Sequence, residues 1–224
     1  MKIDILTLFP SMFDGFISES IIKRAILNKL LFVNLIDFRE YSPLNNKQVD
    51  DTPYGGGAGM LLRCEPIFNC LDEVKKPDSY VIMLGPSGKT FNQSMALEMS
   101  KKKHLILLCG RYEGFDERIK TLIDEEISIG DYVLTGGEVP AMVLVDTISR
   151  LIPGVINKDS LIDESFNNNL LDYPNYTKPS VYRGLAVPVV LINGDHKKID
   201  LYRVNEQIKK TTQLRPDLIG DTYE

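Results

Sequence analysis

Hydrophobic and polar residues recur with regular periods over the first 150 residues of the chain. Residues 2–9 alternate between polar and apolar types and predict a strand, and residues 32–38 are predicted as a second strand. Between them, apolar residues at helical spacing over residues 18–31 predict an amphipathic helix. Residues 80–85 and 104–109 are continuous apolar runs, which are typical of strands buried on both faces.

Helices are predicted between these strands, at residues 66–76, 92–102 and 115–123, with a further helix ending near Ile152. Apolar strands that alternate with helices predict an α/β fold whose parallel sheet is covered on both faces. Ligands of such sheets bind beyond the carboxyl ends of the strands. Three glycine-bearing loops are expected at those ends, so we expect them to converge on one pocket; they comprise residues 85–89, 110–114 and 130–137.

The stretch at residues 128–140 reads SIGDYVLTGGEVP and is the densest of these loops. Its glycines tolerate positive φ and close backbone approach, and they surround a short apolar core at residues 132–134. Pro140 suits the first turn of a helix, so a tight loop leading into a buried helix is predicted. Taken alone, an ordinary strand–turn–helix corner is the simpler interpretation.

Two long segments lack a regular period. Residues 39–64 contain DDTPYGGGAGM and are predicted as a loop, which at this length is more often functional than idle. Beyond Ile152, a polar stretch at 157–164 and three asparagines at 167–169 have the composition of a linker, so a domain boundary is predicted near residue 160. Asp195 is a plausible N-cap for a last helix that runs to about Thr212.

Composition is that of a soluble globular protein. Of the 224 residues, 43% are hydrophobic and 25% are charged. A chain of this length and hydrophobic content can form a sizeable hydrophobic core. The amino-terminal residues lack a long apolar region, so no targeting segment is expected, and the apolar runs are too short to span a membrane. The three cysteines form no CxxC pair, which predicts neither a disulfide framework nor a zinc site and favours the reducing cytoplasm.

Charge is distributed unevenly along the chain. The formal net charge is −5, yet residues 174–216 carry eight Lys and Arg against three Asp and Glu, which leaves −10 for the rest. Such asymmetry suggests a carboxy-terminal part that faces a polyanion. A merely solvated basic face fits the same numbers equally well.

Other candidate motifs are weaker. GPSGKT at residues 85–90 has the context of a phosphate-binding loop, but the required first glycine is replaced by Met83, so a nucleotide hydrolase is kept only as a minor alternative. His104 precedes an apolar strand and is predicted to be structural, and the two distant histidines make no metal site alone. Glu113 and Asp116 either cap the following helix or hold a cation.

Six blocks of the sequence together resemble the bacterial tRNA (guanine-N1)-methyltransferases, the TrmD family. They occur in the family's order and cover nearly the whole chain. They read VDDTPYGGGAGM at 49–60, LGPSGKTFNQ at 84–93, LLCGRYEGFDER at 107–118, SIGDYVLTGGEVPAM at 128–142, SRLIPGV at 149–155 and LLDYPNYTKP at 170–179.

The resemblance implies a SPOUT-type methyltransferase, in which a parallel sheet with helices on both faces carries a trefoil knot at its carboxy-terminal end; nothing in the periodicity shows a knot. It implies an S-adenosylmethionine-binding domain over residues 1–159, a linker over 160–172 and a small, mostly helical tRNA-binding domain over 173–224. The expected enzyme is a homodimer with active sites shared between subunits. It would methylate N1 of the guanosine immediately 3′ of the anticodon in tRNA. Mg²⁺ is implied by the resemblance alone, since no ligand set is visible.

By the same resemblance, the residues expected to contact S-adenosylmethionine come from the three glycine-bearing loops. Backbone N–H and C=O groups beside apolar walls suit an adenine ring, and Glu113 would favour the sulfonium charge or help to hold the bent cofactor. The set is Leu84, Pro86, Gly110, Tyr112, Glu113, Ile129, Gly130, Asp131, Tyr132, Val133, Leu134, Gly136, Gly137 and Pro140.

The reaction requires a base, because N1 of guanine carries a proton at neutral pH, and a positive group near O6. The resemblance assigns the positive group to Arg150. The family's base is the aspartate of an Asp-Ser-Phe triplet, and here the triplet begins with Glu164, whose side chain is one methylene longer. Asp163 would be the base if the linker is shifted by one residue. Lys178, Asn169 and Asn175 also depart from the family's usual residues and put single tRNA contacts in question.

Two other functions remain compatible with the sequence. A related SPOUT methyltransferase acting on another RNA would share the same motifs. A non-catalytic RNA-binding protein would explain the basic segment, but the retention of Arg150 with the carboxylates Asp163 and Glu164 argues against lost chemistry.

Overall fold

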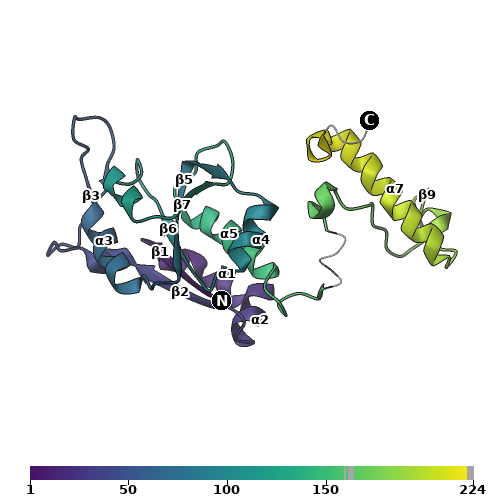
Figure 1. The fold of residues 1–224 in the computed structure, drawn as a ribbon, viewed down its shortest axis with the longest axis horizontal. Coiled ribbons are helices and arrows are strands. Elements are labelled where there is room, and N and C mark those ends of the chain that lie inside the picture. Colours follow the sequence, from purple (N-terminus) through teal and green to yellow (C-terminus); the bar gives the residue numbers. More distant parts are fainter. Residues whose placement is uncertain (159, 161–163, 221–224) are drawn as a thin grey trace. The chain divides into compact units, whose positions relative to one another are not determined.

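The computed structural model describes residues 1–158, 160 and 164–220 (Figure 1). The chain divides into two compact units, Met1–Ile156 and Asn157–Glu224. The first unit holds the sheet and the second holds the long carboxy-terminal helix.

The first unit is built on a five-stranded sheet with the order β2-β1-β6-β5-β7. Every neighbouring pair is parallel, as the sequence pattern predicts. The strands are β1 (Lys2–Thr7), β2 (Phe32–Asp37), β5 (Ser79–Thr90), β6 (His104–Cys109) and β7 (Glu125–Ser128). The apolar period shows no strand at β7, because two of its four residues are glutamates.

Central strand β6 is buried along its whole length and separates two hydrophobic cores. Leu105, Leu107 and Cys109 belong to one core, and Ile106 and Leu108 belong to the other. Because successive side chains of a strand point to opposite faces, helices must cover both sides of the sheet, and Figure 1 shows this arrangement. The first core takes in α2 (Ser20–Leu27), α4 (Gln93–Ser100) and α5 (Glu138–Arg150); the second takes in α3 (Cys64–Val74) and the 3-10 helices η2 (Phe38–Tyr41) and η3 (Glu117–Thr121).

The connection from β1 to β2 is broken into shorter helices than the predicted one at residues 18–31. It consists of η1 (Pro10–Phe13), α1 (Asp14–Ser18) and α2. Ser20, the first residue of α2, and Lys29, two residues after its end, have positive φ values of 53° and 58°, so the backbone leaves the helical conformation at both ends of α2.

The helix predicted at residues 115–123 is wrong. Only the 3-10 helix η3 forms there, because the chain before it is extended and pairs with Leu62. Leu62 N–H donates to Gly114 C=O at 2.9 Å, and Asp116 N–H donates to Leu62 C=O at 2.9 Å. The Asp116 side chain then accepts from Arg118 N–H at 2.9 Å and begins the 3-10 turn.

The loop predicted at residues 85–89 lies within β5 instead. Pairing of β5 with β7 stops at Leu84 and resumes at Lys89, and both of these residues lie opposite Ile127. The intervening residues therefore bulge out from the ladder. Gly88 permits this path, because a Cβ there would lie 2.4 Å from the backbone of Glu126.

The long segment at residues 39–64 is not wholly irregular either. Strand β3 (Asp50–Asp51) pairs antiparallel with β4 (Leu61–Leu62), and η2 precedes them. Between the two strands, Gly55, Gly56, Gly57 and Gly59 all have positive φ, which explains why this turn needs so many glycines.

The second unit is organised around α7 (His196–Leu214), whose start agrees with the predicted cap at Asp195: its side chain accepts from Lys198 N–H at 3.3 Å. Thr211 Oγ1 on α7 accepts from Leu171 N–H at 2.9 Å, and Lys210 Nζ donates to Asp172. The unit also contains the hairpin of β8 (Val181–Tyr182) and β9 (Leu185–Ala186), and the 3-10 helices η4 (Asn167–Asn169), η5 (Val189–Leu191) and η6 (Pro216–Leu218). Among the described residues of both units, no helix has the length and apolar character needed to cross a membrane.

A buried carboxylate ties together the amino-terminal ends of three strands. Asp4 on β1 is 0% exposed and accepts from Lys2 Nζ at 2.7 Å and from Asn34 Nδ2 at 2.7 Å. His104 Nε2 lies 2.8 Å from Asp4, and its Nδ1 lies 2.7 Å from Ser79 Oγ. His104 is thus a buried structural residue, as predicted.

We expect Asp4→Asn to lower the free energy of unfolding by about 2 kcal/mol, because one amide oxygen cannot serve all three donors and a buried donor is left without a partner. Urea unfolding followed by circular dichroism measures the change. The matched control is Glu98→Gln, which alters a 68% exposed carboxylate paired with Lys101 and should change stability by less than about 0.5 kcal/mol. Equal effects of the two substitutions would contradict the structural role of Asp4.

Candidate functional site

A pocket of about 420 Å³ opens at the carboxyl ends of β6 and β7, beside the bulged part of β5. This volume falls within the usual range for small-molecule sites. All three glycine-bearing segments contribute, so they converge as expected. The lining residues are 83–87, 110–117, 120, 126–130, 132–137 and 140.

Every residue expected to contact the cofactor lines this pocket except Asp131. The structure therefore brings together residues that lie more than fifty positions apart, from Leu84 to Pro140. Their binding role stays a prediction. Sequence reasoning missed Arg111 and Glu126, which also line the pocket. Arg111 lies in the GRYEG block and its buried partner Glu138 follows the paired glycines of a second block, so the two motifs contained both residues without indicating their contact.

The apolar residues 132–134 at the centre of the loop are exposed. Tyr132, Val133 and Leu134 are 56%, 93% and 41% exposed, and all three line the pocket. Gly130, with φ of 146°, makes room for the Tyr132 ring: a Cβ at residue 130 would lie 2.5 Å from Tyr132 Cε1.

The far end of the loop is pressed against the end of β6. Gly137 N–H donates to Gly110 C=O at 2.9 Å. A Cβ at residue 137 would lie 2.6 Å from Cα of Cys109 and 2.8 Å from the backbone nitrogen of Gly110. The φ of Gly137 is −82°, a value that any residue can adopt. Glycine is therefore needed here because the two backbones lie too close for a side chain, and not because of its conformation.

The walls of the pocket suit a flat heterocycle that carries hydrogen-bonding groups. Among the described residues, the backbone N–H groups of Val133, Leu134 and Gly136 have no hydrogen-bond partner, and these residues line the pocket. Leu84 and Ile129 supply apolar surface at the same site. A purine offers acceptors to such amides and a face to such walls, so the residues present fit the adenine part of S-adenosylmethionine.

Acidic side chains occupy one side of the pocket. Glu113 lies against Gly59, where a Cβ would be 2.6 Å from its Oε1. Asp116 caps η3, and its hydrogen bond with Arg118 holds the pKa of the Asp116 carboxyl below its usual value. Of the two sequence interpretations, Asp116 follows the capping one. Among the described residues, no cluster of three or more His, Cys, Asp or Glu could hold a metal ion.

Cys109 lies under the pocket and is fully buried. Burial raises the pKa of its thiol well above the usual value, so it is a poor nucleophile at neutral pH.

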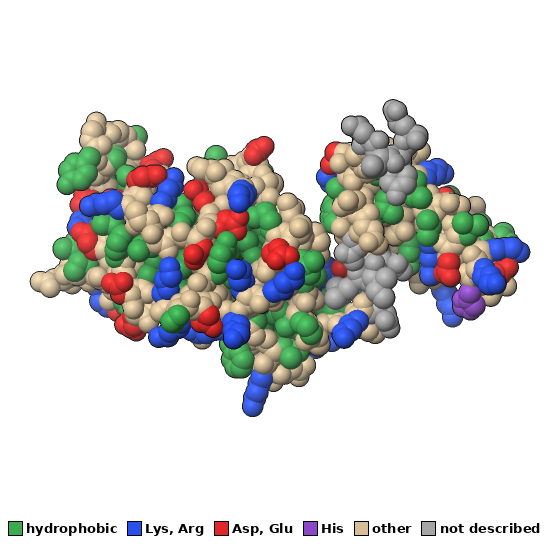
Figure 2. Space-filling model, in the orientation of Figure 1, with side chains coloured by type: hydrophobic (Ala, Val, Ile, Leu, Met, Phe, Trp, Pro, Cys, Tyr) green, Lys and Arg blue, Asp and Glu red, His purple; other side chains and the backbone are tan. Residues whose placement is uncertain are grey.

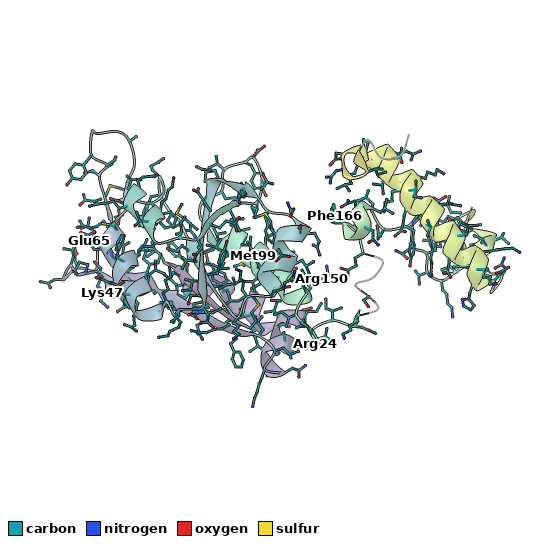
Figure 3. All side chains as sticks on the ribbon, in the orientation of Figure 1. Arg24, Lys47, Glu65, Met99, Arg150 and Phe166 are labelled. Atoms are coloured by element: carbon teal, nitrogen blue, oxygen red, sulfur yellow. The ribbon has the colours of Figure 1, made fainter. Side chains whose placement is uncertain are left out.

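The two predicted catalytic residues belong to different units. Arg150 is the last residue of α5 in the first unit (Figure 3), and Glu164 lies in the second unit and is partly buried. Asp163, the alternative base, lies outside the described residues.

Charge on the visible face of the first unit is mixed, with acidic and basic side chains interspersed (Figure 2). In the second unit, Lys and Arg side chains lie near a visible histidine, with some Asp and Glu side chains among them. The same unit has a cation beside an exposed ring: the guanidinium of Arg183 lies 5.2 Å from the ring centre of Tyr182, which is 58% exposed. Cations beside exposed rings suit a nucleic-acid surface.

A family model described as tRNA (guanine-1)-methyltransferase TrmD matches residues 1–221. Three curated relatives bear the name tRNA (guanine-N(1)-)-methyltransferase. The protein of Malacoplasma penetrans is 54% identical over 218 residues, 97% of this chain and 96% of the relative. That of Carboxydothermus hydrogenoformans is 52% identical over 221 residues, covering 98% and 87%, and that of Listeria monocytogenes is 50% identical over 225 residues, covering 98% and 92%.

We expect Gly137→Ala to lower the free energy of unfolding by about 2 kcal/mol, because the new methyl group collides with the backbone at Cys109 and Gly110. Urea unfolding measures the loss. Gly15→Ala is the matched control: it lies in α1 with nothing within 4 Å of the added Cβ, so stability should stay level or rise by up to about 1 kcal/mol. Equal stability of the two variants would show that the close approach at Gly137 is not a constraint.

Proposed function

The chain belongs to the tRNA (guanine-1)-methyltransferase family, and we propose that it transfers a methyl group from S-adenosylmethionine to N1 of the guanosine immediately 3′ of the anticodon. The enzyme class follows from the family. The donor, the position in the tRNA and the residues in each role are the proposed parts. The pocket carries the proposal, since it is lined by all but one of the residues where the resemblance places the donor. With tRNA as substrate, we place the reaction in the cytoplasm.

The donor's adenine would lie against the loop at residues 130–137, where the free backbone amides of Val133, Leu134 and Gly136 are donors. Leu84, Pro86 and Ile129 would form the apolar walls. When bound, S-adenosylmethionine supplies a methyl group activated by a sulfonium charge. The carboxylate of Glu113 favours that charge from the pocket wall.

Glu164 would accept the N1 proton of the target guanine. Loss of that proton turns N1 into a nucleophile and places negative charge on O6. Arg150 would then stabilise the charge, because a guanidinium donates hydrogen bonds and stays positive at neutral pH. The carboxylate of a glutamate lies one methylene farther from the backbone than that of an aspartate. The reaction rate depends on the placement of this group relative to N1.

An exposed apolar face on the first unit supports a homodimer. Phe9, Met12, Val139 and Val143 are 42%, 43%, 47% and 39% exposed, and they come from η1 and α5, which contact each other, and from the residue before η1. Apolar residues grouped on adjoining elements typically mark interfaces. We place a second copy of the chain here, with each active site built from two subunits.

A trefoil knot and a tRNA-binding role for the second unit complete the proposal. The chain leaves β7 at the edge of the sheet and returns past β5 to the end of β6, where Gly137 bonds Gly110 before α5 begins. A knotted crossing requires a return path of this kind. We assign donor binding to residues 1–159, the linker to 160–172 and tRNA binding to 173–224, where phosphates would meet the basic side chains.

Methyl transfer to defined transcripts tests the function. Purified protein, labelled S-adenosylmethionine and a tRNA transcript with guanosine after the anticodon should give labelled tRNA, and the same transcript with adenosine at that position should stay unlabelled. Label in neither transcript would overturn the proposal. Equal label in both would favour a methyltransferase that acts on another site or RNA.

Glu164→Gln should lower turnover at least about 100-fold while the Kd for the donor stays within about twofold, because the amide keeps the shape but accepts no proton. The neighbouring Asp163→Asn is the matched control and should retain near-normal turnover. The reverse result would assign the base to Asp163.

Co-expression of Glu164→Gln with Arg150→Ala tests whether the active site is shared between subunits. If it is shared, each heterodimer holds one intact site, and activity should return to roughly a quarter of the wild-type value. Activity no higher than that of the single variants would place both residues in one subunit.

A further inference from the structure

Glu138 is a buried carboxylate that the proposed chemistry does not use. It begins α5 directly after the pocket loop and is 1% exposed. Its Oε1 accepts from Thr7 Oγ1 at 2.8 Å, and its Oε2 lies 2.9 Å from Nη2 of Arg111. Removing either partner would leave an uncompensated charge in the interior, so the pair must be kept or lost together.

Arg111 connects this carboxylate to the pocket loop. Its Nη1 donates to Thr135 C=O at 3.1 Å, while Nη2 faces Glu138. Its guanidinium lies 4.4 Å from the centre of the Phe9 ring, which fixes the plane of the group. One guanidinium thus holds the loop at two points, residues 135 and 138.

The glycine between these points fits against the pair. A Cβ at Gly136 would lie 2.4 Å from Nε of Arg111 and 2.6 Å from Oε2 of Glu138. The loop backbone therefore lies directly on the ion pair. Gly136 is one of the three loop residues whose free amide we assign to donor binding, so the position of that amide depends on the pair beneath it.

The pair is anchored outside the pocket. Thr7 is the last residue of β1 and is not among the residues that line the pocket; its Oγ1 also accepts from Phe9 N–H at 3.0 Å. The network thus runs from a central strand through a buried carboxylate and a guanidinium to the pocket wall. Such an arrangement transmits the rigidity of the sheet to an exposed loop.

We propose that Arg111 and Glu138 are positioning residues that hold the loop at residues 130–137 in the conformation that binds the methyl donor. The inference rests on the proposed function, since it assigns this pair to the same pocket. It predicts that loss of the pair weakens donor binding specifically, through displaced amides, and leaves the tRNA surface intact.

Two conservative variants test the pair. Glu138→Gln keeps the size of the side chain but removes its charge, and Arg111→Lys keeps the charge but cannot bond Thr135 and face Glu138 together. Each should raise the Kd for S-adenosylmethionine, measured by calorimetry, at least about tenfold. Each should also raise the KM for the donor, while the KM for tRNA changes less than about twofold. Because Arg111 is 17% exposed, its variant remains informative even where Glu138→Gln folds poorly.

The matched control is Asp4→Asn, which alters another fully buried carboxylate of the same unit, at the opposite end of β1. It should lower stability yet leave the Kd for the donor unchanged. The double variant Arg111→Lys/Glu138→Gln should bind about as weakly as the weaker single variant, because groups that act as a unit are not additive.

Variants that bind the donor within twofold of the wild type would overturn the inference, as would an Asp4→Asn variant that loses as much affinity. A wild-type protein that methylates tRNA while the variants bind normally leaves the proposed function standing and refutes the positioning role alone. Wild-type protein that binds no S-adenosylmethionine refutes both.

Discussion

The close approach of two backbone segments, at Gly137 and at Cys109–Gly110, is the constraint on which the pocket depends. The chain that leaves the edge strand β7 has to return to the middle of the sheet before α5 can pack on β1 and β6. At the point of return there is space for a backbone hydrogen bond and for no side chain. The loop at residues 130–136 is the length of chain that spans this return, so its amides lie above the strand ends for a topological reason.

The sheet places a buried carboxylate at each end, and the two have different surroundings. Asp4, at the amino-terminal end of β1, is bonded by Lys2 of its own strand and by Asn34 and His104 of the two neighbouring strands, so it stabilises their alignment. Glu138, reached by Thr7 at the other end of β1, has a guanidinium for its second partner, and that guanidinium lines the pocket. A buried charge is costly wherever it is. Its presence under a ligand-binding loop is explained if it fixes a cation whose other side faces the loop.

The sequence predicted the fold well where the hydrophobic period was long. β6 was placed at its observed ends, and the parallel sheet with helices on both faces was correct, because continuous apolar strands leave few alternatives. It failed at residues 115–123 and 125–128, where pairing with Leu62 and with β5 overrides local preference. The three loops of the pocket were found through their glycines at strand ends, and the individual residues were taken from the family resemblance. The contact between Arg111 and Glu138 was not predicted, because the local sequence does not show which cation pairs with a buried carboxylate.

The pocket is lined by residues of the first unit alone, whereas the proposed base, Glu164, belongs to the second. On the proposed function, the residues that would contact the donor therefore all come from the first unit. The proposed catalytic residues Arg150 and Glu164, in contrast, belong to different units and would act on the same guanine. On this proposal a carboxylate carried with the tRNA-binding segment meets N1 only after tRNA has docked. The methyl donor is then held in a site fixed by the sheet, while the step that makes N1 reactive depends on the correct RNA.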